Sequence, residues 1–266
     1  TVVEYPMYLN GEPYPVSMTM SREEKEKLQA ILKDKNNSVT TSGLRKEDLL
    51  EAYHRFPGEK VISLHQSGRA STATMTVIRE LLSEETGLDI EFMDAHHLTA
   101  AYSVIVQQIA EAVNAGKSIE EIRELLDYIR SNTRHLGAVY DLFYLHRTGR
   151  IGLAKAVLGT AMKIIALLSS SDEPGVRISI GKAKNYIQSN TRFVSIIKKE
   201  LEEKSGTQLR AVISVIGPHE KEAAHLKAAV EQLPCETQVE IHYTNHSNMP
   251  HAGPDFYDIG YTIYSD

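Results

Sequence analysis

The stretch that decides the fold is Val61-Ile62-Ser63-Leu64-His65-Gln66-Ser67-Gly68-Arg69-Ala70-Ser71-Thr72. Its apolar start breaks into a Ser/Gly turn, after which apolar residues recur at helical spacing through residue 82, so it predicts strand, polar turn and helix. The first N–H groups of such a helix point outward, at the positive end of its dipole. Together with the hydroxyls of Ser67, Ser71 and Thr72, they form a candidate site for a carboxylate or phosphate. The stretch alone favours a simpler interpretation, an ordinary Ser/Thr N-cap.

Composition narrows the class of protein. The 266 residues, 42% hydrophobic and 24% charged, are enough for one large or two ordinary globular domains. A net charge of −6 argues against nucleic acid as the main partner. The single cysteine, Cys235, excludes an internal disulfide framework and is typical of a reducing compartment. The longest nearly apolar window, residues 153–168, contains two lysines, and no signal-peptide pattern is visible, so we expect a cytoplasmic protein without membrane insertion.

The first half of the chain alternates strands and helices. Residues 1–14 predict two strands joined at Asn10-Gly11, and Ser21 with Glu24 has the spacing of a capping box. Further strands are expected at 61–65, 88–93 and 136–140, and further helices at 49–56, at 98–115 and after a second capping box, Ser118 with Glu121. This alternation predicts a parallel sheet covered on both faces by helices. Ligands of such sheets bind beyond the carboxyl ends of the strands, and Ser67 and Asp94 both fall there. Asp94 would either orient a hydroxyl of the ligand or cap the helix that follows it.

The pattern changes after Arg150, which predicts a second domain. We expect an α/β domain over residues 1–152 and a smaller α+β domain over 153–266. The elements expected in the second domain are strands at 176–180, 209–216, 238–242 and 257–264, and helices at 186–204 and 220–233.

Four separated stretches resemble motifs of the DegV family, bacterial fatty-acid-binding proteins that carry the acyl chain for fatty acid kinase. Thr41-Ser42-Gly43-Leu44 is placed like that family's Thr-Ser-Gln-Pro, and residues 67–72 resemble its Ser-Ser-x-Leu-Ser-Gly-Thr. Residues 144–151, Tyr-Leu-His-Arg-Thr-Gly-Arg-Ile, are close to its Tyr-Leu-x-x-Gly-Gly-Arg-Ile, and Pro250-His251-Ala252-Gly253-Pro254 is similar to its His-x-Gly-Pro-Gly. Order and spacing agree over nearly the whole chain. The resemblance implies a two-domain DegV-like fold with the ligand between the domains.

Some positions depart from the family pattern. Gly43 and Leu44 stand where the family has Gln and Pro, Thr72-Ala73 replaces Gly-Thr, and Asp255 replaces the last glycine. Ile165-Ala166 replaces a Lys-Pro pair. The family's first strand, which ends in Asp-Ser beside the pocket, has no counterpart in these residues. The N-terminal domain is therefore expected to lack the family's first strand–helix unit.

The resemblance also implies a ligand, a long-chain fatty acid, and no other cofactor. Its carboxylate is expected at Thr41, Ser67, Ser71, Thr72 and His251, whose hydroxyls and imidazole are suitable donors; His251 would otherwise serve only to hold the Gly-Pro turn. Arg150 is expected to contact the transferred phosphoryl group or the partner kinase, although a surface salt bridge explains it equally well. An apolar tunnel for the tail is expected to include Leu153, Ala156, Val157, Leu158, Met162, Ile164 and Ile165. Such a stripe is also typical of ordinary core, but each buried methylene of a tail would contribute about 0.8 kcal/mol.

Other kinds of site have weaker support in the sequence. A hydrolase would need serine, histidine and aspartate, which are present, but no Gly-x-Ser-x-Gly elbow occurs. His242, His246 and His251 cluster without the paired cysteines of a zinc finger, and no Gly-x-x-x-x-Gly-Lys-Ser/Thr P-loop is present. A two-domain receptor for a small polar ligand and a Ser/His-dependent hydrolase remain alternatives. We expect a carrier without a catalytic centre of its own, which presents a fatty acid to an ATP-dependent kinase subunit.

Overall fold

A six-stranded sheet in the order β10-β9-β11-β6-β7-β8 forms the centre of the computed structural model, which describes residues 1–17, 20–84, 87–149, 164–171, 173 and 175–265. Its strands are β6 (Thr133–Val139), β7 (Ile165–Ser170), β8 (Arg177–Ala183), β9 (Gln208–Ile216), β10 (Glu236–Tyr243) and β11 (Phe256–Tyr264). The pair β9–β10 is parallel, whereas β11 runs antiparallel to both of its neighbours. Phe256 lies opposite Val139 of β6 on one side and Ile216 of β9 on the other.

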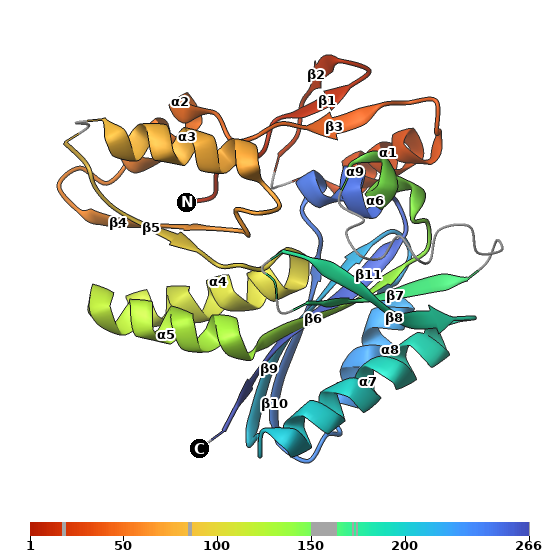
Figure 1. Ribbon diagram of the computed structural model, residues 1–266. Helices are drawn as coiled ribbons and strands as arrows, with labels where there is room; N and C mark the ends of the chain where they lie inside the picture. Colours follow the sequence, from red (N-terminus) through yellow and green to blue (C-terminus); the bar gives the residue numbers. More distant parts are fainter. Residues whose placement is uncertain (18–19, 85–86, 150–163, 172, 174, 266) are drawn as a thin grey trace.

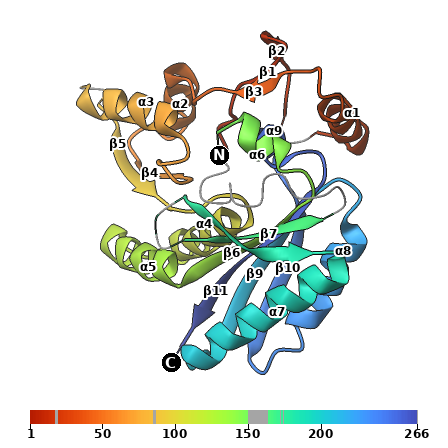
Figure 2. The same cartoon turned by 45° about the vertical axis from the view of Figure 1, so that its right-hand side comes forward.

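Helices cover both faces of this sheet (Figure 1). On one face lie α4 (Thr99–Asn114) and α5 (Ile119–Asn132); on the other lie α7 (Tyr186–Glu203) and α8 (Glu220–Val230), as Figure 2 shows. The first helix of each pair buries an apolar stripe, with Ile105 of α4 and Phe193 of α7 fully buried. Helix α4 lies directly on β11, because a Cβ added at Gly260 would be 2.1 Å from the main-chain nitrogen of Ala101.

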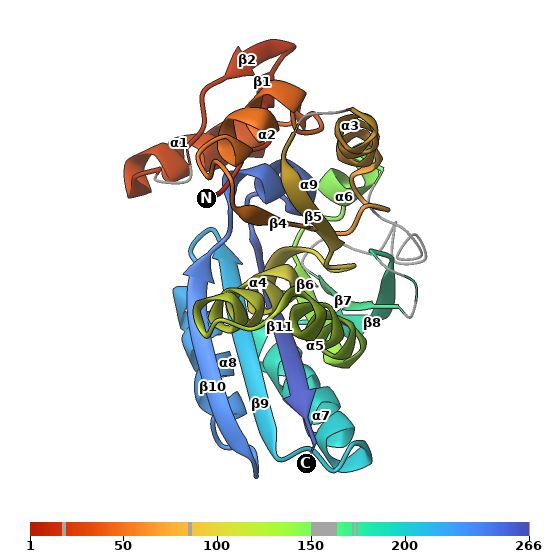
Figure 3. The same ribbon diagram turned by 90° about the vertical axis from the view of Figure 1, so that its left-hand side faces the viewer.

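A second, two-stranded sheet pairs β4 (Lys60–His65) and β5 (Asp89–Asp94) in parallel. Helices α2 (Lys46–Tyr53) and α3 (Thr72–Ser83) cover its outer face, where Val61 packs with Ile78. Its inner face packs on α4 and α5, with Met93 beside Ile105 in one cluster. The pair α4–α5 therefore lies between two sheets, as Figures 1 and 3 show. The carboxyl ends of β4 and β5 coincide, with His65 opposite Asp94.

A third group of elements packs beyond the end of the large sheet. It consists of β1 (Met7–Leu9), β2 (Glu12–Tyr14), α1 (Arg22–Lys33), β3 (Val39–Thr41), α6 (Phe143–Arg147), the 3-10 turn η2 (His246–Asn248) and α9 (Met249–Ala252). These elements share a core with β6, β7, β9 and β11, to which Leu32, Tyr144, Leu168 and Met249 belong. Segments from both halves of the chain thus meet around α9.

The α/β class is confirmed, and so are the elements with strong local signals. Asn10 and Gly11 form the hairpin turn with φ of 53° and 89°, and both predicted capping boxes are present, at Ser21 and Ser118. One expectation is wrong: β6 does not continue a parallel N-terminal sheet but pairs antiparallel with β7 and β11. The expected boundary between 1–152 and 153–266 falls within residues 150–163, outside the described residues, and stays a prediction. Within the part of the chain that the structure describes, no helix is both long and apolar enough to cross a bilayer.

Candidate functional site

The turn after β4 is held against the corresponding turn after β5. Ser67 N donates to the carbonyl of His97 (3.0 Å), and Gly68 N donates to Oδ2 of Asp94 (3.0 Å). The other carboxylate oxygen of Asp94 accepts from the main-chain N–H of His96 (2.7 Å). Asp94 therefore joins the two turns and does not cap α4, whose N-cap is Leu98. The polar turn predicted from the sequence is fixed at the carboxyl edge of the small sheet.

The first turn of α3 begins without a side-chain cap. Ser71 occupies the N-cap position, but its side chain makes no capping hydrogen bond within the described residues. Its Oγ donates instead to Oγ1 of Thr74 (2.9 Å), which also accepts from the main-chain N–H of Leu44 (3.2 Å). The ordinary N-cap favoured by the stretch alone is thus not formed. The start of α3, with its positive dipole end, keeps donors that suit an anion.

The Thr41 stretch connects α3 with α9. Thr41 is the last residue of β3, and its Oγ1 is hydrogen-bonded to Nε2 of His251 on α9, at 3.0 Å. Two residues later, the chain touches α3 so closely that a Cβ added at Gly43 would lie 2.8 Å from the Cβ of Ala73. A hydroxyl and an imidazole separated by 210 positions in sequence are therefore paired beside the uncapped start of α3.

Tyr144 of α6 supports the segment that carries His251. The OH of Tyr144 donates to the carbonyl of Leu32 (2.6 Å), which fixes the ring in the core. Gly253 ends α9 with φ of 91°, and a Cβ there would lie 2.7 Å from the Tyr144 ring. Glycine is required at this position both for the backbone conformation and for the close approach of the ring. Contacts thus link all four of the sequence motifs.

The remaining predicted site residues are placed differently. Ser67 is fully buried, faces Gly175, and its Oγ has no hydrogen-bond partner within the described residues; Thr72 is exposed at the start of α3. Arg150, Leu153, Ala156, Val157, Leu158 and Met162 lie outside the described residues. Ile164 is half-buried just before β7, and Ile165 is buried in the core that includes Phe193 of α7. Ala166 and Leu168 join the core around α9, and the tail tunnel stays a prediction.

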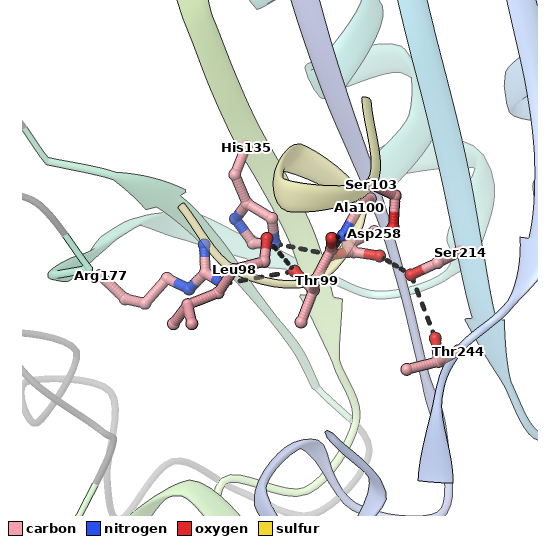
Figure 4. A network of polar contacts seen from close by, with 9 residues as sticks. All are labelled: Leu98, Thr99, Ala100, Ser103, His135, Arg177, Ser214, Thr244 and Asp258. Atoms are coloured by element: carbon pink, nitrogen blue, oxygen red, sulfur yellow. Dashed lines mark hydrogen bonds and ion pairs between the residues drawn. The ribbon is translucent and has the colours of Figure 1, made fainter. Parts of the chain in front are cut away.

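A buried polar network was not anticipated from the sequence (Figure 4). Asp258 of β11 is completely buried and accepts hydrogen bonds from His135 Nε2 (2.9 Å), from Ser214 Oγ and from the main-chain N–H of Ala100 (3.3 Å). Burial alone would raise the pKa of Asp258, but the hydrogen bonds from His135 and Ser214 hold it below its usual value. Burial lowers the pKa of His135 to about 4, so its imidazole is neutral near pH 7. The signal in the sequence was a lone Asp in the alternating apolar strand 256–264.

Arg177 extends this network toward the surface. Its Nη2 donates to Oγ1 of Thr99 (3.3 Å), and Thr99 is one of the non-glycine residues with positive φ, at 51°. Burial lowers the pKa of Arg177 to about 10, so the guanidinium remains charged at neutral pH. The network therefore contains one charged carboxylate (Asp258), one charged guanidinium (Arg177) and one neutral imidazole (His135).

The geometry of this network does not resemble a hydrolytic triad. A triad needs an imidazole that accepts the proton of the serine and is oriented by the carboxylate. Here Asp258 lies between Ser214 and His135 and binds both directly, so the imidazole is bonded to the carboxylate and not to the hydroxyl. These three residues do not support the hydrolase alternative.

Comparison with known proteins gives consistent matches. The profile of the DegV family, described as a family of uncharacterised proteins, matches residues 1–263. A DegV domain-containing protein of Clostridium perfringens is 30% identical over 69% of this chain, and the matched region spans 63% of that protein. One of Deinococcus radiodurans is 26% identical over 74% of this chain and 67% of its own length.

Solved structures match over almost the whole chain. A fatty-acid-binding DegV family protein of Thermus thermophilus superposes with a TM-score of 0.81 at 21% identity, covering 97% of this chain and 91% of that one. The fatty-acid-binding DegV of Bacillus subtilis superposes with a TM-score of 0.79 at 20% identity, covering 98% and 91%. A stearic-acid-binding protein of Eubacterium ventriosum gives 0.81 at 18% identity, covering 97% and 90%. At these identities the superpositions show that the fold is shared.

Proposed function

The chain belongs to the DegV family, and from this premise we propose that it binds a long-chain fatty acid whose carboxylate lies at Thr41, Ser71 and His251. The observation that carries the proposal is the Thr41–His251 pair beside the uncapped start of α3. Relatives of the same fold, from Thermus thermophilus, Bacillus subtilis and Eubacterium ventriosum, are described as fatty-acid-binding proteins, which supports it.

The chemistry of these groups suits a carboxylate on an apolar tail. Two hydroxyls, the outward N–H groups of α3 and the ring of His251 supply donors without a fixed ion pair. The free energy of binding then comes mainly from the tail, at about 0.8 kcal/mol for each methylene removed from water. The core around α9, which includes Leu168, Ala252 and Phe256, is apolar and lies next to the donors, so a tail that enters beside them would pack among apolar side chains.

Native mass spectrometry tests the proposal directly. The purified protein, incubated with palmitate and freed of excess by gel filtration, should carry one added mass of that acid, and the same sample after denaturation should carry none. A protein that retains no long-chain acid, whether palmitate, stearate or oleate, would not be a fatty-acid-binding protein.

Thr41→Val should weaken binding of palmitate by about 1–2 kcal/mol, because it removes a hydroxyl that donates to the carboxylate or orients His251. This corresponds to a dissociation constant about five- to thirtyfold higher, measured by competition with a fluorescent fatty acid. Thr40→Val is the matched control: Thr40 is the exposed neighbour on β3, so this variant should bind like the wild type. Equal affinities for Thr41→Val and Thr40→Val would remove Thr41 from the site.

We further propose that the bound acid is presented to an ATP-dependent fatty acid kinase and that Arg150 assists the phosphoryl transfer. The resemblance of residues 144–151 to the family's Tyr-Leu-x-x-Gly-Gly-Arg-Ile motif supports this role, since a guanidinium matches the geometry of a phosphoryl group. No catalytic step is assigned to this chain itself.

Arg150→Ala should leave binding of palmitate unchanged and lower the formation of acyl phosphate at least about tenfold, equivalent to about 1.4 kcal/mol. The measurement uses the loaded protein, ATP and a purified fatty acid kinase, with hydroxylamine to trap the product as a hydroxamate. Arg79→Ala, on the exposed face of α3, is the control for the loss of one positive charge. Loss of palmitate binding in Arg150→Ala would instead place Arg150 in the fatty acid site.

A further inference from the structure

A cavity of about 440 Å³ opens where the end of α5 meets the starts of α4, β6 and β8. None of Thr41, Ser71 and His251 lines it, so it is distinct from the proposed carboxylate site. The lining residues that bear on its chemistry are Arg130, Arg134, Arg177, His97, Ser131 and Ser170. Three guanidinium groups at one cavity, in a chain with a net charge of −6, call for an explanation.

Among the residues that the structure describes, two of these guanidiniums have no carboxylate in direct contact. The carboxylates that line the cavity, Asp127 and Glu173, are already paired with Arg130 and Arg69. Within the described residues, no carboxylate oxygen lies within 4 Å of the guanidinium nitrogens of Arg134 or Arg177. Asp258 is the negative charge that acts on Arg177, but it does not line the cavity, so among the described residues the cavity wall itself presents two guanidiniums without a directly paired carboxylate.

The positive charges of Arg134 and Arg177 both act on His97, which lines the same cavity. Burial lowers the pKa of His97 to about 4, and the positive charges of Arg177 and Arg134 both contribute to the lowering. This low pKa leaves the imidazole neutral near pH 7, and its Nε2, 3.2 Å from the carbonyl of Arg130, is the donor there because a carbonyl can only accept. A neutral imidazole carries no negative charge, so His97 does not compensate the charges of Arg134 and Arg177.

Both guanidiniums keep donors for a ligand. Within the described residues, the hydrogen bonds of Arg134 use Nη1 and go to the main-chain carbonyls of Ser131 and Thr133, whereas that of Arg177 uses Nη2. Among the described residues this leaves Nε and Nη2 of Arg134 as an adjacent pair of donors, and Nε and Nη1 of Arg177 as separate donors. The buried Oγ of Ser170 also lacks a hydrogen-bond partner in the described part of the chain. A planar pair of N–H donors matches the oxygens of a phosphate group.

We propose that this cavity binds a phosphate group between Arg134 and Arg177, either free or carried by a small molecule. A phosphate near pH 7 carries a charge of about −1.5 to −2, which balances two guanidiniums better than one carboxylate does. The cavity is wider than a phosphate ion alone, so the remainder of a phosphomonoester can be enclosed as well.

Isothermal titration at constant ionic strength tests the site, with inorganic phosphate and phenyl phosphate as separate probes and sodium chloride as the blank. The wild type should bind at least one probe, and Arg134→Gln should bind it at least tenfold more weakly. Arg177→Lys keeps the charge but loses the separate Nε and Nη1 donors of the guanidinium, and it should also bind more weakly. Arg192→Gln, an exposed arginine of α7, is the matched control and should bind like the wild type.

The probes and the variants separate the possible outcomes. Binding of phenyl phosphate in preference to inorganic phosphate would identify an ester as the ligand, and the reverse preference would identify free phosphate. Equal binding by wild type and Arg134→Gln, or no binding of either probe by the wild type up to about 10 mM, would overturn the proposal. Palmitate binding should be unaffected in Arg134→Gln, so the result does not depend on the fatty acid site.

Discussion

Asp258→Ala should lower the free energy of unfolding by about 3–5 kcal/mol, measured by urea denaturation followed by circular dichroism. Asp258 accepts hydrogen bonds from His135, Ser214 and the main-chain N–H of Ala100, and all of these donors are buried. Its removal leaves them without an acceptor and leaves Arg177 without its nearby negative charge. The loss of stability arises mainly from these unpaired donors, since a buried polar group without a partner keeps its full desolvation penalty.

Asp89→Ala provides the matched control for Asp258→Ala. Asp89 forms a surface ion pair with Lys60 (2.6 Å), and both side chains are about half exposed. Such pairs contribute about 1 kcal/mol or less. If Asp258→Ala were no less stable than Asp89→Ala, the network in Figure 4 would contribute no more to stability than a surface ion pair.

Gly260→Ala should destabilise the protein by about 3 kcal/mol or more, because the new Cβ would collide with main-chain atoms. The added Cβ would lie 2.1 Å from N and 2.3 Å from Cα of Ala101, and no rotamer change relieves a contact with a helix backbone. Helix α4 would have to move away from β11, which would also stretch the hydrogen bond from Ala100 to Asp258. Thermal and urea denaturation would measure the loss.

Gly137→Ala gives a graded comparison on the neighbouring strand β6. The nearest atoms to a Cβ at Gly137 are in the side chains of His135 (2.9 Å) and Phe256 (3.4 Å), which can shift. Its destabilisation should therefore be smaller than that of Gly260→Ala. A stable Gly260→Ala would contradict the backbone-to-backbone packing of α4 on β11.

Elements with short-range causes could be predicted from the sequence. The capping boxes at Ser21 and Ser118 and the Asn10-Gly11 turn depend on residues within four positions of one another, so their geometry is present in the local pattern. The strand–turn–helix of residues 60–83 was predicted for the same reason.

Strand direction could not be predicted in this way. The residues of β6 form a clear strand pattern, but their pairing partners in β11 lie about 120 positions later, for example Ile259 opposite Leu136. An apolar run has the same appearance in a parallel and in an antiparallel sheet, so β6 was wrongly assigned to a parallel one. The short helices α6 and α9 were missed because helices of four or five residues have no full period to recognise.

The candidate site likewise combines features that follow from local sequence with contacts between residues far apart in the chain. The donors at the start of α3 follow from local sequence, but the pairing of Thr41 with His251 crosses the whole chain and was expected only from the family motifs. The network of Asp258, His135 and Ser214 was missed because the three residues lie on three different strands, and no local pattern in any one strand points to the other two. Their common depth in the sheet appears only when the strand register is known.

The position of β11 in the middle of the six-stranded sheet has a consequence for biosynthesis. The ribosome synthesises β6 to β10 before β11. In the folded sheet, however, β11 lies between the pair β9–β10 and the group β6–β7–β8 and joins them. Until residue 264 has left the ribosome, both groups present an open edge of unpaired main-chain groups, which favours aggregation. Closing the sheet then needs contacts of long sequence separation, which form slowly. A nascent chain of this protein thus spends its most vulnerable period just before its central strand is complete.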